Sequence, residues 1–151
     1  MRIFQKITLV FVSCLSLCRA ATIDSSFPAV VEKGFAEYDR SGAVMAINAW
    51  EKGGALENDS RASGKFRAFK DATDSLGSYR SAEKILTKPI GKNSQIIYTA
   101  MNFKRGALYM RFWLYRIDAE WVVQNFTFST RPEAIMPWLA VEGETPAQDE
   151  Q

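Results

Sequence analysis

The sequence contains no histidine, and its two cysteines, Cys14 and Cys18, both lie within the first twenty residues. Without histidine the chain has no imidazole base, so a Ser-His-Asp triad and a Cys/His zinc site are excluded. Five prolines and nine glycines among 151 residues are too few for a collagen-like repeat or a low-complexity chain. The sequence also lacks an apolar run of about 20 residues, the length that a membrane-spanning helix needs. With an apolar fraction of 47%, these absences leave a folded globular domain as the expected class.

The first twenty residues are typical of a secretory signal peptide. Two positive charges precede an apolar run over 7–17, and the segment ends in a small residue, Ala20. We expect cleavage after Ala20 and export to the periplasm or the outside of the cell. Two alternatives stay open: the segment is kept as a membrane anchor, or Cys18 is lipidated, although Leu17 stands where lipoprotein signals carry a small residue.

Loss of this signal would change the charge of the chain. Arg2, Lys6 and Arg19 would leave, so the 19 basic residues fall to 16 while the 17 acidic residues stay, which gives a net charge of −1. A near-neutral chain has no general attraction for nucleic acid or anionic membranes. We therefore expect no nucleic-acid partner and no membrane span after signal removal. Because both cysteines leave as well, the mature chain has no disulfide and no thiolate ligand, and neither a metal site nor a cofactor is expected.

Hydrophobic periodicity predicts three helices in the first half of the mature chain. Apolar residues recur at helical spacing over 27–38, which predicts a first helix with one apolar stripe. After Ser41-Gly42 the pattern predicts either a second helix or a kinked extension of the first, which ends at Gly53-Gly54, and a third helix is predicted over 60–75.

After Gly77 the hydrophobic period changes from 3.6 to 2, which is typical of strands. Four strands are predicted, over 79–86, 95–103, 107–117 and 121–129. A turn at 88–91 and short connections between the later strands indicate an antiparallel meander, and 132–139 is expected to form a short turn of helix. The predicted fold class is α+β, with N-terminal helices packed on a curved four-stranded antiparallel meander sheet. This single domain is expected over 21–141, followed by a mobile acidic tail over 142–151.

The alternation of side chains along the strands divides the predicted sheet into two faces. If Arg105-Gly106 is a two-residue turn, Phe103 lies opposite Leu108, and one face is almost wholly apolar. We expect the helices to cover that face. The opposite face would carry Tyr98, Tyr109, Arg111, Trp113, Tyr115, Gln124, Phe126 and Phe128.

Aromatic side chains with polar tips are typical of pockets and protein interfaces, so this second face is the candidate binding surface. Its candidate ligand- or partner-binding residues are Tyr98, Arg111, Trp113, Tyr115 and Gln124. The predicted function is an exported, non-catalytic domain that binds a small amphipathic molecule or a protein through this face. A homodimer that uses the same face without a ligand is an alternative. Arg111, at a strand centre, would either pair or stack within the protein, or bind a carboxylate or another anion.

The order of the elements resembles a known fold. Helices followed by a long antiparallel meander, with Gly106 in a hairpin turn and a strand that starts at Trp121, resemble the nuclear transport factor two-like, or ketosteroid-isomerase-like, fold over 27–139. The run 121–130 is also similar to small exported bacterial proteins of unknown function, including a quorum-sensing-regulated virulence-factor family. Members of the larger fold act as isomerases, cyclases, binding modules and dimerisation domains, so the resemblance leaves these functions open.

The resemblance implies one enzymatic alternative, a ketosteroid-isomerase- or cyclase-like enzyme with a Tyr-lined pocket. Proton abstraction beside a carbonyl needs a base in the cavity and a hydrogen-bond donor for the oxyanion. Between Gly77 and Arg131 the only acids are Glu83, Asp118 and Glu120, and the last two fall in a predicted hairpin turn. Glu83 beside a tyrosine is therefore the candidate base of this alternative, while the main hypothesis assigns no catalytic residue.

Overall fold

The computed structural model describes residues 22–23, 27–60 and 63–139. The N-terminal elements are the short strand β1 (Thr22–Ile23) and the helices α1 (Ala29–Ser41), α2 (Ala43–Glu51) and α3 (Ser63–Leu76). The strands that follow are β2 (Tyr79–Pro89), β3 (Ser94–Phe103), β4 (Gly106–Ile117) and β5 (Glu120–Ser129). The last elements are the short helix α4 (Pro132–Ile135) and the 3₁₀ turn η2 (Pro137–Leu139). The expected signal segment 1–20 and the acidic tail 142–151 lie outside the described residues.

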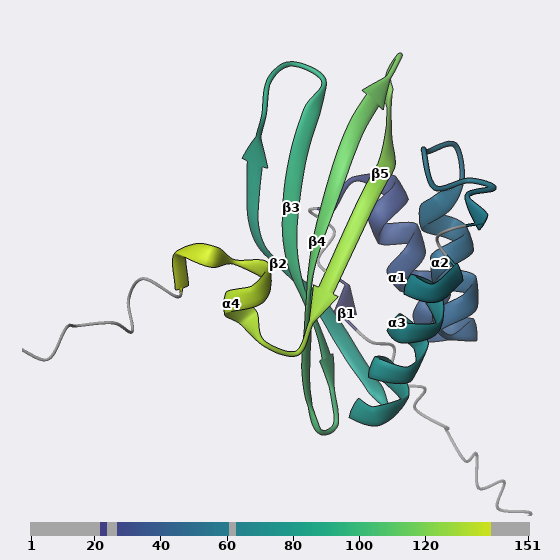
Figure 1. Ribbon diagram of the computed structural model, residues 1–151, viewed down its shortest axis with the longest axis vertical. Helices are drawn as coiled ribbons and strands as arrows, with labels where there is room; N and C mark the ends of the chain where they lie inside the picture. Colours follow the sequence, from purple (N-terminus) through teal and green to yellow (C-terminus); the bar gives the residue numbers. More distant parts are fainter. Residues whose placement is uncertain (1–21, 24–26, 61–62, 140–151) are drawn as a thin grey trace, which may run out of the picture.

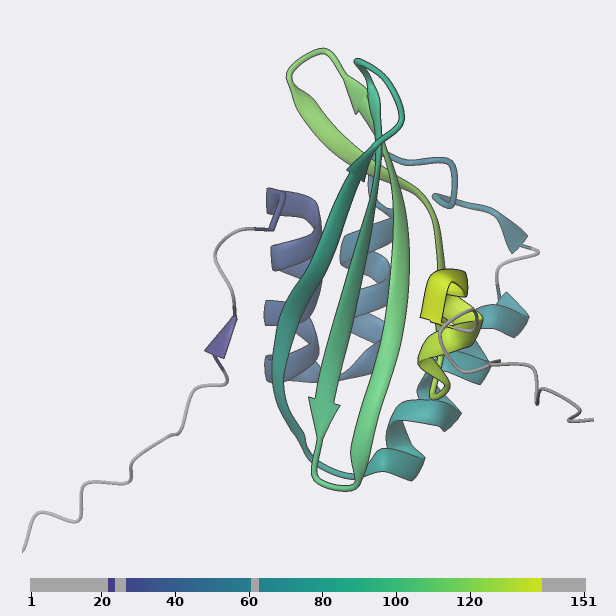
Figure 2. The same ribbon diagram turned by 90° about the vertical axis from the view of Figure 1, so that its left-hand side faces the viewer.

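The molecule has a helical layer and a sheet. Strands β2 to β5 form an antiparallel meander, and β1 pairs in parallel with β2. Figures 1 and 2 show α1, α2 and α3 on one side of the sheet and α4 on the other. We call these sides the inner face, which the three helices cover, and the outer face. The α+β class, with N-terminal helices on a four-stranded antiparallel meander, is confirmed.

Strand β2 is longer than predicted. Its ladder continues through Lys88 and Pro89, which lie opposite Ile96 and Gln95 of β3. The turn therefore begins only at Ile90, whose N–H donates to the carbonyl oxygen of Ser94 at 2.8 Å. Proline is tolerated here because β1 pairs with β2 much earlier, at 81–82, so the other side of β2 is a sheet edge at this point.

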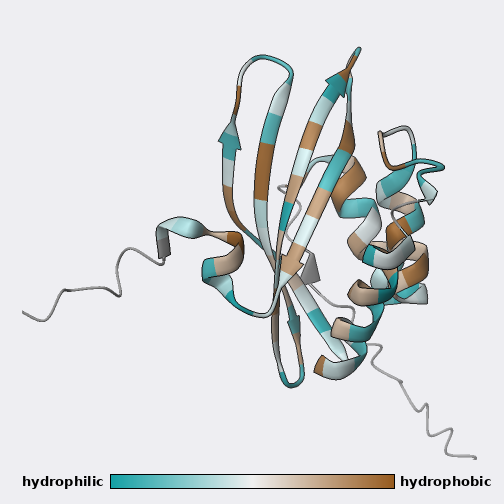
Figure 3. Cartoon of the chain, in the orientation of Figure 1, coloured by the Kyte–Doolittle hydropathy of each residue, from teal (hydrophilic) through white to brown (hydrophobic). Residues whose placement is uncertain are grey.

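The core is centred on Trp50 of α2, which is fully buried. Its ring lies between 5.1 and 5.7 Å, centroid to centroid, from the rings of Phe35, Phe69, Phe112 and Phe126. The indole N–H donates to the carbonyl oxygen of Val31 at 3.2 Å. Gly34 provides the room for this contact, because a Cβ there would lie 1.8 Å from Nε1 of Trp50. Figure 3 shows apolar positions along both the helices and the strands that enclose this centre.

The β3–β4 hairpin differs from its predicted register but not from its predicted faces. Phe103 lies opposite Gly106, so the turn is Lys104-Arg105 and each pair is displaced by two residues from the prediction. The backbone N–H groups of Lys104 and Arg105 donate to carbonyls at the end of α3 and just before β2, which holds the turn in this position. Since a shift of two residues keeps every side chain on the same face, the predicted apolar face of β3 and β4 is the inner face.

The faces of strand β5 differ from the prediction. Val123 lies opposite Leu114, but Asn125 lies opposite Trp113, so Gln124 is an extra residue in a β-bulge. Beyond the bulge, Phe126 and Phe128 lie opposite Phe112 and Met110 of the inner face. The prediction that Phe126 and Phe128 belong to the outer face was wrong. The extra residue reverses the parity of the strand and places both rings against Phe69 of α3.

Candidate functional site

Part of the outer face is covered by the C-terminal segment α4–η2. Ile135 and Met136 are buried there against Ile96 and Tyr98 of β3. The ring of Trp138 stands edge-on to that of Tyr98, with centroids 4.8 Å apart. Tyr98 is only 5% exposed as a result. This cover was missed, although the apolar residues that follow Pro132 were a sequence signal that the predicted helical turn packs against the sheet.

The uncovered part of the outer face carries two exposed aromatic side chains. Trp113 is 45% exposed and Tyr115 is 40% exposed, on a strand whose neighbours at 112 and 114 are fully buried. Trp113 lies opposite Ile96 on β3, and Tyr115 lies opposite Ser94. Large aromatic side chains on a paired, central strand are costly to leave in water and are typical of a binding surface.

Arg111 completes this surface. It is half-buried on β4, between Tyr98 of β3 and Thr127 of β5 in the ladder. Within the described residues its side chain has no ion pair, hydrogen bond or ring contact, so neither of the internal roles considered for it is observed. The cation over the Phe126 ring is instead Lys65 of α3, 5.4 Å from the centroid. A half-buried guanidinium without a partner is suited to bind a carboxylate.

Four of the five candidate residues therefore lie together on the sheet. We call Arg111, Trp113 and Tyr115 the aromatic patch, and half-buried Gln124 lies beside it at the β5 bulge. The fifth, Tyr98, is in the same ladder but lies under Trp138 and cannot contact a partner while α4–η2 stays in place.

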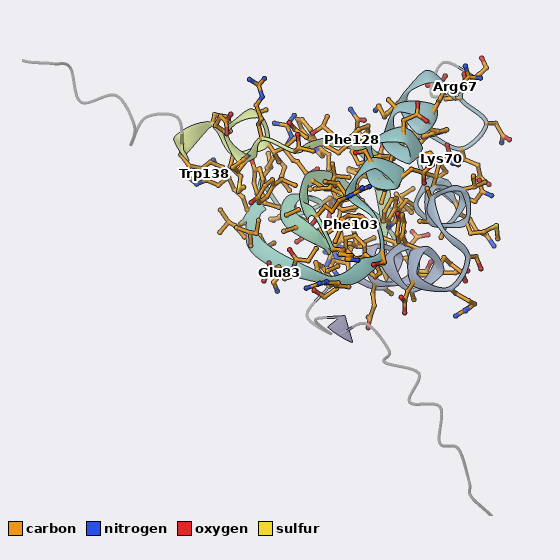
Figure 4. All side chains as sticks on the ribbon, turned by 90° about the horizontal axis from the view of Figure 1, so that it is seen from below. Arg67, Lys70, Glu83, Phe103, Phe128 and Trp138 are labelled. Carbon is orange, nitrogen blue, oxygen red and sulfur yellow. The ribbon has the colours of Figure 1, made fainter. Side chains whose placement is uncertain are left out.

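The acids of the enzymatic alternative lie on the surface. Glu83 is exposed and accepts a hydrogen bond from the side-chain amide of Asn102 at 3.1 Å. Figure 4 shows Glu83 near the edge of the molecule, away from Phe103 and Phe128, which belong to the core between the helices and the sheet. Asp118 and Glu120 are exposed at the β4–β5 turn. Across 27–60 and 63–139 no carboxylate is buried, so no candidate base faces the interior there.

Two tyrosines do lie inside, at the end of the molecule where α1 meets β2. The hydroxyl of Tyr79 is buried without a hydrogen-bond partner, and its ring packs against Tyr38 and Phe103. Burial raises the pKa of Tyr79 well above its ordinary value, and the nearby carboxylate of Asp39 raises it further. Burial also raises the pKa of Tyr38. Both side chains are half-buried and pack against the core, and no carboxylate among the described residues is buried beside them.

Two other features, a membrane-spanning helix and a metal-binding cluster, are absent from the described residues. No helix among them is long and apolar enough to cross a membrane. They also contain no group of three or more Asp, Glu, His or Cys side chains placed to hold a metal ion.

Comparisons of the chain with protein-family models, with curated proteins and with solved structures find no significant match. The architecture, with N-terminal helices on a four-stranded antiparallel sheet, is compatible with the nuclear transport factor two-like fold. That fold carries many functions, so compatibility with it does not assign one to this chain.

Proposed function

We propose that this protein is an exported, non-catalytic binding domain whose aromatic patch binds a protein segment that presents apolar side chains and a carboxylate. The observation that carries the proposal is the exposure of Trp113 and Tyr115 beside the unpaired, half-buried guanidinium of Arg111. Aromatic and arginine side chains dominate the energetics of protein interfaces. The carboxylate of the partner would satisfy Arg111 while its apolar side chains cover the two rings.

A protein segment is favoured over a small ligand because of how the same face is already used. The segment α4–η2 lies on the outer face and buries Ile135 and Met136 there. The outer face thus accepts a short amphipathic segment as a partner, and the aromatic patch continues the surface that this segment covers. A second copy of the chain is the alternative occupant, which would make the protein a homodimer.

The resemblance of the chain to two known families fits the same proposal. Membership of the nuclear transport factor two-like family or of the virulence-factor family would be consistent with an exported binding module, and export itself rests on the signal-like residues 1–20. The isomerase- or cyclase-like alternative is not favoured, because Glu83 is exposed and is hydrogen-bonded to Asn102.

The proposal can be tested by site-specific photo-crosslinking in the native host. A p-benzoylphenylalanine residue at position 113 should give one adduct of discrete mass. The same residue at position 44 is the matched control, since Val44 is 56% exposed but lies on α2, away from the outer face. The variant Arg111→Gln should reduce the yield of the adduct at position 113 by about fivefold or more, because the partner loses its charged contact.

Each result has a clear meaning. An adduct at position 113 that depends on Arg111 and is absent at position 44 supports the proposal. An adduct with twice the mass of the chain, together with a dimer in sedimentation that Trp113→Glu dissociates, replaces the protein partner by a second copy. Equal labelling at positions 113 and 44, or no adduct, overturns the proposal.

A further inference from the structure

A cleft lies at the opposite side of the sheet, between the helical layer and the β4–β5 hairpin. Figures 1 and 2 show the start of α1, the end of α2 and this hairpin at the same end of the molecule. The cleft has a volume of about 510 Å³. This is within the range of about 300 to 1,000 Å³ that small-molecule sites occupy.

The floor and walls of the cleft are mostly apolar. The largest side chain is Trp121 of β5, which is half-buried and packs against the core. Val30 of α1, Ala49 of α2 and Val122 of β5 are also among the lining residues. Three separate parts of the chain meet here, and the indole of Trp121, whose ring also lies under the guanidinium of Arg116, adds a large apolar surface to the lining.

Positive charges outnumber negative ones at the rim of the cleft, where the carboxylate of Glu57 also accepts a hydrogen bond from the backbone N–H of the lining residue Gly53. Lys33 of α1 and Lys52, just after α2, both line it, and Glu120 is the only acid among the described residues of the lining. Within the described residues, neither lysine has an ion pair or a side-chain hydrogen bond. Arg116 adds a third positive charge next to the cleft, with its guanidinium 5.6 Å from the centroid of the Trp121 ring.

We infer that this cleft binds a small amphipathic anion, with a flat apolar body on Trp121 and a carboxylate or sulfonate head group between Lys33 and Lys52. Two unpaired ammonium groups on the rim of an apolar cleft recognise this combination, because the body leaves water while the head group gains two charge-assisted contacts. The site is separate from the aromatic patch, so it does not depend on the proposed function.

The competing cleft lies between α2 and α3. It is smaller, about 240 Å³, and is lined by Val44, Ile47, Phe66, Arg67 and Lys70 among others. It also combines apolar walls with two cations, but the ammonium group of Lys70 is already paired with the carboxylate of Asp74. This groove therefore supplies a matched control rather than the preferred site.

The inference can be tested with a pair of fluorescent probes that differ in charge. The anion 1-anilinonaphthalene-8-sulfonate and the neutral N-phenyl-1-naphthylamine share the same apolar body. We expect the double variant Lys33→Gln/Lys52→Gln to weaken binding of the anion by about fivefold and to leave binding of the neutral probe unchanged. The variant Ala49→Phe, which fills the cleft, should weaken binding of both probes.

The matched control is Arg67→Gln/Lys70→Gln, which removes the same charge from the other groove. Figure 4 shows both of these residues on α3. Both double variants lower the net charge equally. If the anion bound only through general electrostatic attraction, its binding would weaken in both variants. The proposed site predicts a loss only in Lys33→Gln/Lys52→Gln.

Indole N–H resonances locate the bound probe directly, because the chain has four tryptophans. Addition of 1-naphthoate should shift the Trp121 resonance in the wild type and in Trp113→Glu alike. The Trp138 resonance should stay in place in both proteins, and the Trp113 resonance should stay in place in the wild type. The inference is overturned if Lys33→Gln/Lys52→Gln binds the anion as the wild type does, or if both double variants lose binding of the anion equally. It is also overturned if binding of the neutral probe weakens as much as binding of the anion, or if the Trp113 resonance shifts instead of the Trp121 resonance. The results with the lysine variants and the two fluorescent probes do not bear on crosslinking at position 113, so the two proposals fail independently.

Discussion

The ring of Trp138 meets the ring of Tyr98 edge-on, with centroids 4.8 Å apart and planes at 82°. This contact divides the outer face of the sheet into two parts. Under α4–η2 the aromatic side chains are part of a small second core, together with Ile96 and Met136. Beyond it, Trp113 is open to solvent. Tyr98 and Trp113 lie on the same face of the sheet, but Tyr98 is part of a core and Trp113 is exposed.

This division predicts opposite results for two alanine substitutions on the outer face. Tyr98→Ala should lower the free energy of unfolding by about 2 to 4 kcal/mol, because it leaves a cavity under Trp138. Trp113→Ala should change it by less than about 1 kcal/mol, because the side chain it removes is half exposed. Urea unfolding at neutral pH measures both. If Trp113→Ala unfolds the protein, Trp113 is a core residue and the aromatic patch is not a binding surface.

Because Gly34 lies directly against Trp50, replacing this glycine by a residue with a side chain should strongly destabilise the protein. Gly34→Ala should cost about 3 kcal/mol, because the new Cβ would lie 1.8 Å from Nε1 of a fully buried indole. Gly64 is the matched control, since it is also helical and a Cβ there meets no atom of the described residues within 4 Å. Gly64→Ala should stabilise the protein by about 0.5 kcal/mol. Thermal unfolding distinguishes the two, and equal effects would mean that the helices do not pack as described.

Tyr79 predicts a loss of stability at alkaline pH. Its pKa is raised above 10.0 in the folded protein, first by burial and then by Asp39, so only the unfolded chain releases this proton just above pH 10. The contribution of the protonated Tyr79 side chain to the free energy of unfolding is therefore complete below pH 10 and is lost as the pH rises. Between pH 9 and pH 11 the wild type should lose about 1 kcal/mol more than Tyr79→Phe, which has no phenolic proton.

The same variant makes a second measurement possible at neutral pH. Because the Tyr79 hydroxyl is buried without a partner, Tyr79→Phe should be at least as stable as the wild type there. Denaturant titrations at pH 7, 9 and 11 give both quantities. Parallel stability curves for the two proteins would show that the Tyr79 hydroxyl is open to solvent.

The signal-like residues predict the mass and thiol content of the exported protein. Cleavage after Ala20 removes both cysteines, so the mature chain should begin at Ala21 and should not react with maleimide. Intact-mass spectrometry of the protein from its own host checks this. A chain that begins at Cys18 and carries acyl mass would show a lipoprotein, and an uncleaved chain with two reactive thiols would show that the segment is kept.

The positions of the helices and strands could be predicted from the sequence because they depend on local periodicity. The apolar stripe that begins at Phe27 becomes the buried side of α1, and the change of period after Gly77 coincides with the start of β2. The faces of β3 and β4 were also predicted correctly, even though the turn lies one residue earlier. A displacement of two residues keeps the parity of side chains.

The same parity argument failed on β5 because one extra residue reverses it. Nothing in the local pattern marks Gln124 as a bulge. The bulge follows from packing at a distance, since it lets Phe126 reach Trp50 and Phe69. The sequence alone could not weigh those contacts, because they join residues more than fifty positions apart.

The candidate sites show the same limit. The helices, the meander and an aromatic strand with an arginine at its centre could be predicted from the sequence, since each depends on residues a few positions apart. Packing between distant elements places α4–η2 over Tyr98, leaves Trp113 open, and brings Lys33, Lys52 and Trp121 to one cleft. These groupings depend on how separate elements pack, and that packing is set by the fit of the whole core around Trp50 rather than by any local pattern.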